Sequence, residues 1–374
     1  MAGGDILLLA AGDVAPDRDD PAECFALAAD TLRQADIAFC QLECNLTEGG
    51  SRLPQARHTH RSTIKAAHAM KAAGFNLVSF AGNHCMDWGK EGFFDTIANL
   101  QAADLKVVGV GANIDAARAP VIQEVRGTKV ATLAYSSILP MSYWAEADRP
   151  GCAPVRAHTI YEQIEHDQPG TPARVHTYAH RGDLAALLDD IAKAKAVADV
   201  VVVSLHWGIH FVPAVLADYQ QEVAHAAIDA GADLILGHHA HILKGIEVYR
   251  GKAIFYSLSN FAVDLRMTPE HAASKGFKEI QALSPGWEPD FDSLYNFPPD
   301  ARMTLIAKAV ISGGAITRVG YLPAFINRQA QPQVLSAGDP RFIQVIDYVR
   351  AIGVAVDLDT GFVVQGDEVL IQTS

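Results

Sequence analysis

The chain has 374 residues, of which 49% are hydrophobic, so it is long enough for one large domain with an appended lobe or for two domains. Acidic residues outnumber basic residues by 43 to 30, which gives a formal net charge of −13. Because nucleic acids and anionic membrane surfaces attract basic footprints, this charge argues against both as partners.

The cysteines and the N-terminus point to a reducing compartment. The chain has five cysteines, which is few for its length and an odd number, so we do not expect a disulfide framework. The first residues lack a basic segment, and no apolar run reaches the roughly 18 residues that cross a bilayer. We therefore expect reduced thiols and a soluble, cytoplasmic protein with no membrane anchor. Monomer and homo-oligomer both remain open.

The first third of the chain alternates between short apolar runs, typical of buried strands, and helical patterns. We expect strands at residues 6–11, 37–42, 77–80, 107–108, 121–122 and 130–135, and helices at 21–34, 63–73 and 90–103. This alternation predicts a largely parallel sheet. Three of the runs are followed directly by polar side chains, namely Asp13, Glu43 and the pair Asn83-His84.

A polar loop at residues 52–62 carries His58, His60 and Arg61. We expect these side chains to contact a small anionic substrate. His210, two residues beyond Trp207-Gly208, is a further candidate for the same role.

The second half of the chain contains two stretches without regular patterns. Residues 139–181 hold five prolines, and residues 264–300 are rich in proline and aromatic residues, so we expect irregular, lid-like insertions there. Between and after them we expect helices at 182–196, 218–230 and 341–351, strands at 200–205 and 234–236, and hairpins at 243–259 and 303–321. The two strands end at His206 and at the run Gly237-His238-His239-Ala240-His241.

Strand ends thus present a set of side chains that suits metal ions, namely Asp13, Glu43, Asn83, His206, His239 and His241. In open α/β sheets ligands bind beyond the carboxyl ends of the strands. Carboxylate, carboxamide and imidazole groups together favour Mn, Zn or Fe, and one carboxylate can bridge two ions. We therefore predict a dinuclear site with two divalent metal ions. His238 is expected to pack behind these ligands.

These segments resemble the calcineurin-like metallophosphoesterases, in particular the CapA-like branch associated with poly-γ-glutamate synthesis and capsules. The matching segments follow the family's order over roughly residues 5 to 262 and are Gly12-Asp13-Val14, Leu42-Glu43-Cys44-Asn45, Gly82-Asn83-His84, Asp87-Trp88-Gly89, His206-Trp207-Gly208, Gly237 to His241 and Tyr256 to Phe261. The resemblance implies an α/β fold, a four-layer αββα metallophosphoesterase-like sandwich over residues 1–325. Insertions at about 139–181 and 264–300 would act as lids, and residues 326–374 would form a C-terminal extension packed on the core.

The resemblance also implies roles for the site residues. Glu43 takes the bridging position, and the ligands Asn83, His206 and His239 complete one metal site. Asp13 and His241 hold the other ion. His84 is the catalytic residue that donates a proton to the leaving group or stabilises its charge.

Three features depart from the family. Ala15 stands where the wider superfamily has a histidine, so the Asp13 site is one imidazole short, and His58, His60 or another loop histidine is a candidate replacement. Glu43 stands where the superfamily usually has Asp. CapA-type proteins commonly carry a membrane anchor, which we do not find, and this argues against capsule assembly at the cell surface.

We therefore expect a metal-dependent hydrolase that uses a metal-activated water on a phosphoester or on an amide, lactone or γ-glutamyl bond. The alternative is a non-catalytic accessory component of poly-γ-glutamate or capsule polymer synthesis.

Overall fold

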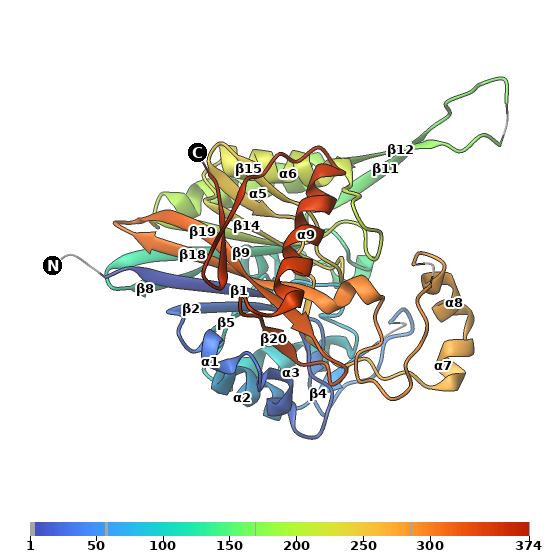
Figure 1. Ribbon diagram of the computed structural model, residues 1–374, viewed down its shortest axis with the longest axis horizontal. Helices are drawn as coiled ribbons and strands as arrows, with labels where there is room; N and C mark the ends of the chain where they lie inside the picture. The colour runs from blue at the N-terminus through green and yellow to red at the C-terminus, as the bar shows by residue number, and fades with distance from the viewer. Residues whose placement is uncertain (1–3, 57–58, 169, 285, 374) are drawn as a thin grey trace.

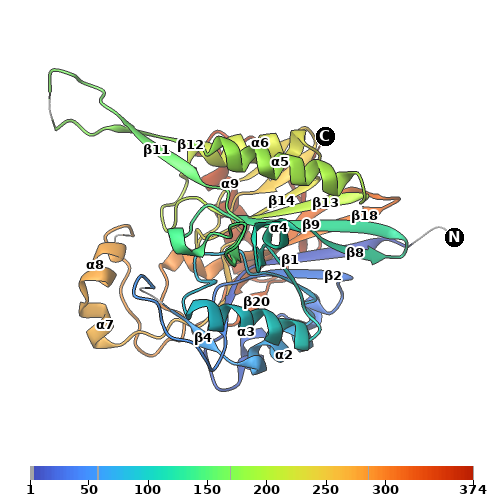
Figure 2. The same cartoon turned by 180° about the vertical axis from the view of Figure 1, so that it is seen from behind.

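The structure, a computed structural model, describes residues 4–56, 59–168, 170–284 and 286–373. Two β-sheets pack face to face, and helices cover the outer face of each sheet (Figures 1 and 2). The expected α/β fold, a four-layer αββα sandwich, is confirmed.

The first sheet has the order β21-β22-β19-β18-β1-β2-β5-β6, with β17 beside β1 and β20 beside β19. Strands β1, β2, β5 and β6 run parallel, whereas β18 is antiparallel to β1. Helices α1 (Ala29–Leu32), α2 (Ile64–Ala73) and α3 (Gly89–Ala102) lie on its outer face (Figure 1). The strand bounds are β1 Ile6–Ala15, β2 Ile37–Leu42, β5 Leu77–Ser79, β6 Lys106–Val108, β17 Asn260–Val263, β18 Met303–Ser312, β19 Ala315–Ile326, β20 Pro332–Val334, β21 Phe362–Gln365 and β22 Glu368–Ile371.

The second sheet has the order β15-β16-β14-β13-β9-β8. Helices α5 (Arg181–Lys195) and α6 (Asp218–Asp229) cover it (Figure 2). Its four inner strands are parallel to one another. The strand bounds are β8 Val121–Val125, β9 Thr128–Ser136, β13 Val200–His206, β14 Leu234–His238, β15 Ile246–Tyr249 and β16 Lys252–Phe255. Of the strands expected in the first third of the chain, the last two, now β8 and β9, therefore belong to this second sheet.

The central strands are buried on both faces because each sheet lies between a helical layer and the other sheet. Every residue of β13 is buried, as the unbroken run of valines predicts. The five cysteines are buried as free thiols, as expected. Helix α9 (Pro340–Val354) packs against β19 of the first sheet and β15 of the second, and β22 pairs with β19.

The prediction that residues 139–181 are irregular is wrong for part of the segment. Strands β11 (Ala157–Glu162) and β12 (Arg174–Ala179) pair over six residues as an antiparallel ribbon that projects from the body (Figures 1 and 2). Ile160, Tyr161 and Val175 are exposed. Only the base of the ribbon joins the core, through Ala157 and Ala179, so most of its length lacks the apolar alternation that identifies a half-buried strand.

The second irregular prediction, for residues 264–300, is also wrong in part. This segment contains two short helices, α7 (Pro269–Ala273) and α8 (Lys275–Gln281). Each begins with a capping side chain, Thr268 for α7 and Ser274 for α8. The remaining short elements are η1 Pro21–Phe25, β3 Asn45–Leu46, β4 Arg61–Ser62, β7 Val110–Gly111, α4 Ile114–Arg118, η2 Met141–Tyr143, β10 Gly151–Cys152 and η3 Pro299–Arg302.

Within the described ranges, no helix combines the length and the apolar character that a bilayer-spanning segment requires.

Candidate metal centre

The polar strand ends of both sheets converge on one place. Asp13 lies in β1, in register with Gln41 of β2 and Asn260 of β17. Glu43 follows β2, and Asn83 follows β5 by a short turn. From the second sheet, β13 ends at His206, and the turn after β14 carries His239 and His241.

Two glycines allow the strand ends to approach closely. A Cβ atom on Gly12 would lie 2.0 Å from the carbonyl oxygen of Ser259, and one on Gly237 would lie 2.2 Å from that of Tyr256. Only glycine fits at either position without a backbone shift. The two glycines therefore let β1 and β14 lie directly against the segment that leads into β17.

Asp13, Glu43 and His206 form the buried centre of the cluster. One donor atom from each lies within 4.8 Å of those of the other two. The Nε2 atom of His206 lies 3.3 Å from Oε1 of Glu43 and 2.7 Å from Oδ1 of Asn83. One carboxylate, one carboxamide and one imidazole therefore meet at a single point.

A second group surrounds the other side of Asp13. Nδ1 of His241 lies 3.6 Å from Oδ2 of Asp13 and 2.9 Å from Oδ1 of Asn260. The backbone N–H of His239 donates to Oδ2 of Asp13 at 3.2 Å, and the His239 ring lies 4.9 Å from that of His206 between centroids. The buried His238 places Nδ1 3.2 Å from Oδ1 of Asp13.

The turn that carries the last two histidines is strained. His239 and His241 have φ values of 86° and 57°, in a region that side chains other than glycine rarely adopt. Strain of this kind persists where the surrounding structure fixes it, and it concentrates at functional sites.

The donor set fits divalent cations. Among the described residues, Oδ1 of Asp13, Oε1 of Glu43, Nδ1 of His206 and Nδ1 of His239 are buried without a hydrogen-bond partner. Burial, together with the charge of Asp13, raises the pKa of Glu43 to about 8. Burial, reinforced by neighbouring histidines, holds the pKa values of His206 and His239 well below the usual range. Neutral imidazoles beside two crowded acids are ready ligands, and a bound cation would offset the cost of burying the acids.

His84 lies beside this cluster and is held by a second acid. Its Nδ1 donates to Oδ2 of Asp87 at 2.7 Å, and the Tyr143 hydroxyl donates to Oδ1 of Asp87 at 2.9 Å. Burial of the His84 ring opposes its protonation, but the hydrogen bond to Asp87 and the charges of Asp87 and Glu43 raise its pKa to about 9. Its contact with Asp87 therefore favours the protonated form of His84.

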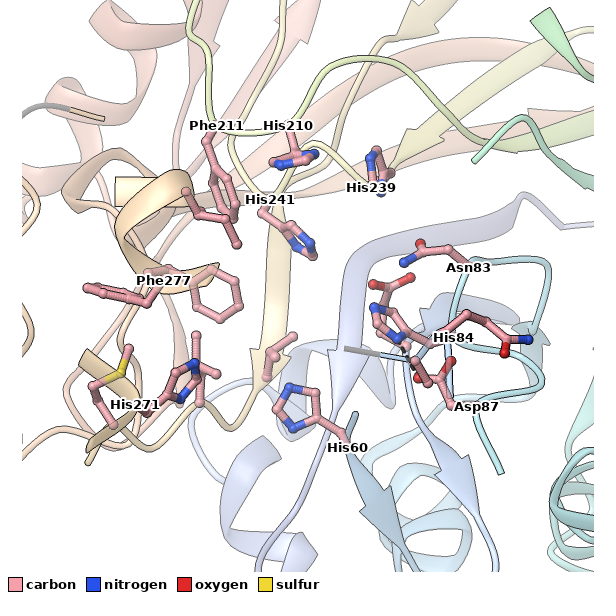
Figure 3. Close-up of a pocket in the computed structure, with 18 of the residues that line it drawn as sticks. His60, Asn83, His84, Asp87, His210, Phe211, His239, His241, His271 and Phe277 are labelled. Atoms are coloured by element: carbon pink, nitrogen blue, oxygen red, sulfur yellow. Dashed lines mark hydrogen bonds and ion pairs between the residues drawn. The ribbon is translucent and has the colours of Figure 1, made fainter. Parts of the chain in front are cut away.

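The cluster opens into a cavity of about 290 Å³ (Figure 3). His239 and His241 lie along one wall, and Asn83, His84 and Asp87 lie across from them in Figure 3. The part of the lining that the structure describes contains neither lysine nor arginine.

The residues expected to contact substrate separate into three groups. His60 and His210 line the cavity, and Nδ1 of His60 lies 3.7 Å from Oδ2 of Asp17. Arg61 does not line it, because its guanidinium stacks over the Trp88 ring at 4.2 Å and donates to the carbonyl of Thr47 at 2.8 Å. His58 lies outside the described residues.

From the sequence, Asp87 was named only as part of the matching segment Asp87-Trp88-Gly89 and was given no role, and Tyr143 was not singled out. Asp87 follows His84 by three residues in the same turn, a spacing that could have suggested the contact. Tyr143 belongs to the proline-containing insertion and gave no signal.

Comparison with known proteins adds a family match and several relatives. Residues 1–265 match the family model described as "Bacterial capsule synthesis protein PGA_cap". The chain is 33% identical over 207 residues to the PGA biosynthesis protein CapA of Bacillus subtilis, covering 55% of this chain and 46% of that protein. It is 31% identical over 246 residues to a probable polyglutamine synthesis accessory protein of Mycobacterium tuberculosis, covering 64% of this chain and 58% of that protein.

The matched region is thus about half as long as the Bacillus subtilis relative. Among solved structures, a calcineurin-like phosphoesterase from Bacillus subtilis aligns with 94% of this chain and 98% of its own, at 15% identity and a TM-score of 0.42.

Proposed function

Since this chain belongs to the PGA_cap family of bacterial capsule synthesis proteins and carries a convergent cluster of acids and imidazoles, we propose that it is a metal-dependent hydrolase. The observation that carries this proposal is the set of buried, unpartnered donor atoms on Asp13, Glu43, His206 and His239. Of these residues, Glu43 and His239 line the cavity that His84 also lines.

Two divalent ions, Mn, Zn or Fe, would be held by these residues. Glu43 would be shared, Asn83, His206 and His239 would complete one site, and Asp13 and His241 would hold the other. When bound, such ions acidify a water molecule and neutralise charge that develops on the substrate's oxygen atoms.

His84 would supply the proton that the leaving group requires. In a protonated ring, the carboxylate of Asp87 would fix Nδ1–H and Nε2–H would remain for the leaving group. The Tyr143 hydroxyl holds Asp87 in turn. This chain of contacts keeps the His84 ring in one orientation.

The scissile bond is best matched by a carbonyl compound. A phosphoester would receive positive charge only from the bound ions and His84, because the described lining offers no lysine or arginine. Hydrolysis of an amide or ester, including a lactone or γ-glutamyl bond, develops negative charge on one oxygen and releases one leaving group that must be protonated. The bound ions would stabilise that charge and His84 would supply that proton. We therefore favour amide or ester hydrolysis over phosphoester hydrolysis.

An accessory role in polymer synthesis is the second candidate. Its support is the naming of the relatives, one of which is described as an accessory protein of polyglutamine synthesis. In that case the acid and histidine cluster would serve stability or docking and not turnover.

Metal analysis and one matched pair of variants separate the two candidates. We expect about two Mn, Zn or Fe ions per purified chain, the stoichiometry of a two-metal site. We expect hydrolysis of amide or ester test substrates that His84→Ala abolishes and that His166→Ala, an exposed histidine near the tip of the β11–β12 ribbon, leaves unchanged. A protein that retains no metal and hydrolyses neither 4-nitrophenyl phosphate nor any carbonyl substrate would instead be an accessory protein.

A further inference from the structure

We propose that the cavity beside the metal centre selects a substrate whose group next to the scissile bond is uncharged and aromatic or branched alkyl. This inference rests on the proposed hydrolase function and names the substrate class for the same site. It concerns the wall of the cavity that faces away from His84.

That wall is apolar and largely aromatic. We call it the aromatic wall, and it consists of Phe211, Met267, Phe277, Ile280, Trp287 and Phe297. All but Phe211 come from the 264–300 segment, which includes α8. Phe277 and Trp287 are each less than 5% exposed, yet both line the cavity. Figure 3 shows Phe211 and Phe277 on the side of the cavity opposite His84 and Asp87.

The aromatic wall begins at the metal centre itself. The Phe211 ring stacks on His241 with centroids 5.3 Å apart and planes 23° apart, and Phe297 also lies 5.3 Å from His241. Phe211 continues to Trp287 at 5.8 Å, and Trp287 continues to Phe277 at 5.0 Å. A substrate group attached to the reacting carbon would therefore meet aromatic surface at once.

Phe211 is held in place at a cost to the backbone. Its φ of 62° lies in the left-handed region, and the flanking N–H of Val212 donates to the carbonyl of His210 at 2.9 Å. The Phe211 N–H donates to the carbonyl of Ala240 at 3.0 Å, which ties this loop to the histidine turn. This strain at Phe211, which joins His241 to the rest of the aromatic wall, supports a functional role for the position of its ring.

The charge around the aromatic wall disfavours an ionic substrate group. The described lining has no lysine or arginine. A carboxylate placed against the rings of Phe211, Phe277 and Trp287 would lose its hydration without meeting a lysine or arginine, whereas an apolar group gains by burial.

Trp287 adds one polar feature to this surface. Its indole N–H is buried and has no acceptor among the described residues. A ring or side-chain oxygen on the substrate's apolar group would satisfy it. Trp287→Phe removes the N–H donor and keeps most of the apolar ring area, so it separates the contribution of the hydrogen bond from that of apolar burial.

Binding of three small amides tests the inference on the metal-loaded protein. The probes are phenylacetamide, acetamide and malonamate, which carry an aromatic, a methyl and a charged group on the same amide. Isothermal titration calorimetry gives the dissociation constants, and release of ammonia gives the hydrolysis rates. We expect phenylacetamide to bind at least tenfold more tightly than either other amide, and Phe277→Ala to remove that preference.

The control is Phe291→Ala, which truncates an exposed phenylalanine in the same 264–300 segment. It should change neither the dissociation constants of the three amides nor their hydrolysis rates. Ile280→Ala serves as a second, smaller truncation of the aromatic wall if Phe277→Ala does not fold. Equal binding of the three amides, or a preference that survives truncation of the aromatic wall, would overturn the inference. If phenylacetamide binds selectively but no carbonyl substrate is hydrolysed, the substrate class stands and the proposed hydrolase function fails.

Discussion

Nε2 of His206 lies 2.7 Å from the side-chain oxygen of Asn83, although the two residues are 123 positions apart and lie at the ends of strands in different sheets. Neither residue alone identifies a site. Their contact shows that the carboxyl ends of β5 and β13 face the same space, and it places Glu43 within 3.3 Å of the same imidazole nitrogen. The centre is therefore built across the interface between the sheets.

Asp87→Asn is expected to lower kcat by roughly 10- to 100-fold with little change in KM, because Asp87 acts by orienting His84 through Nδ1. The matched variant Tyr143→Phe removes only the hydroxyl that holds Asp87 and should cost less. Steady-state kinetics on the best carbonyl substrate provides the measurement, with metal content determined in parallel. A rise in KM with an unchanged kcat would contradict the positioning role.

Manganese should stabilise the wild-type protein against unfolding through the acid and histidine cluster. At a free ion concentration of 100 times the dissociation constant, the gain in unfolding free energy is about 2.7 kcal/mol. Glu43→Gln should abolish most of this gain, because it removes the carboxylate that both ion sites share. The control Glu162→Gln changes an acid on the exposed β11–β12 ribbon. Thermal unfolding with Mn²⁺ and with EDTA checks the prediction, and an identical shift in Glu43→Gln would rule it out.

Gly12→Ala should destabilise the fold by about 3 kcal/mol, since the added Cβ would lie 2.0 Å from a backbone oxygen that cannot move independently. Gly276→Ala is the matched control, because no atom lies within 4 Å of its Cβ position and the residue is in helix α8. There we expect a gain of about 0.5 kcal/mol from helix propensity. Urea unfolding measures both, and comparable effects in the two variants would contradict this steric explanation.

Lys244 should make stability depend on pH above neutrality. The side chain is buried, its ammonium donates to the carbonyls of Val212 and Val215, and burial lowers its pKa from 10.5 to about 8. Between those two values the unfolded chain binds more protons than the folded one, so the unfolding free energy rises with pH.

Comparison with Lys244→Met isolates this contribution because the remaining groups are shared. The unfolding free energy of wild type minus that of Lys244→Met should increase from about pH 8 to about pH 10.5, by on the order of 3 kcal/mol. Chemical denaturation at several pH values gives the difference. A constant difference across that range would show that Lys244 titrates normally in the folded protein.

The strand ends of the site could be predicted because buried parallel strands leave a strong signal. Apolar runs such as Val200–Leu205 end abruptly at a polar residue, and the carboxyl ends of parallel strands share one edge. The sequence pattern therefore predicted that Glu43 and His206 lie in one site. The family match over residues 1–265 supports the resemblance from which their roles were inferred.

Features that depend on tertiary contact could not be predicted in this way. Arg61 reads as a loop cation available to a substrate, but the Trp88 ring and two backbone carbonyls occupy its guanidinium. All of the aromatic wall except Phe211 lies in a segment without periodicity, so its residues gave no pattern to connect them. Most of the β11–β12 ribbon lacks a buried face and is therefore invisible to a search for alternating hydrophobicity.

The pairing of β1 has a consequence for the shortest chain that can fold. Its first half, Ile6–Ala10, pairs with β18 (Met303–Ser312), while Asp13–Ala15 pair with β17. A fragment ending at residue 265, where the family match stops, would retain every candidate ligand but leave half of its central strand as a bare edge. Such an edge invites pairing between molecules. Truncation at the family boundary should thus yield aggregates, and a chain that folds on its own needs the sequence through β19 at least.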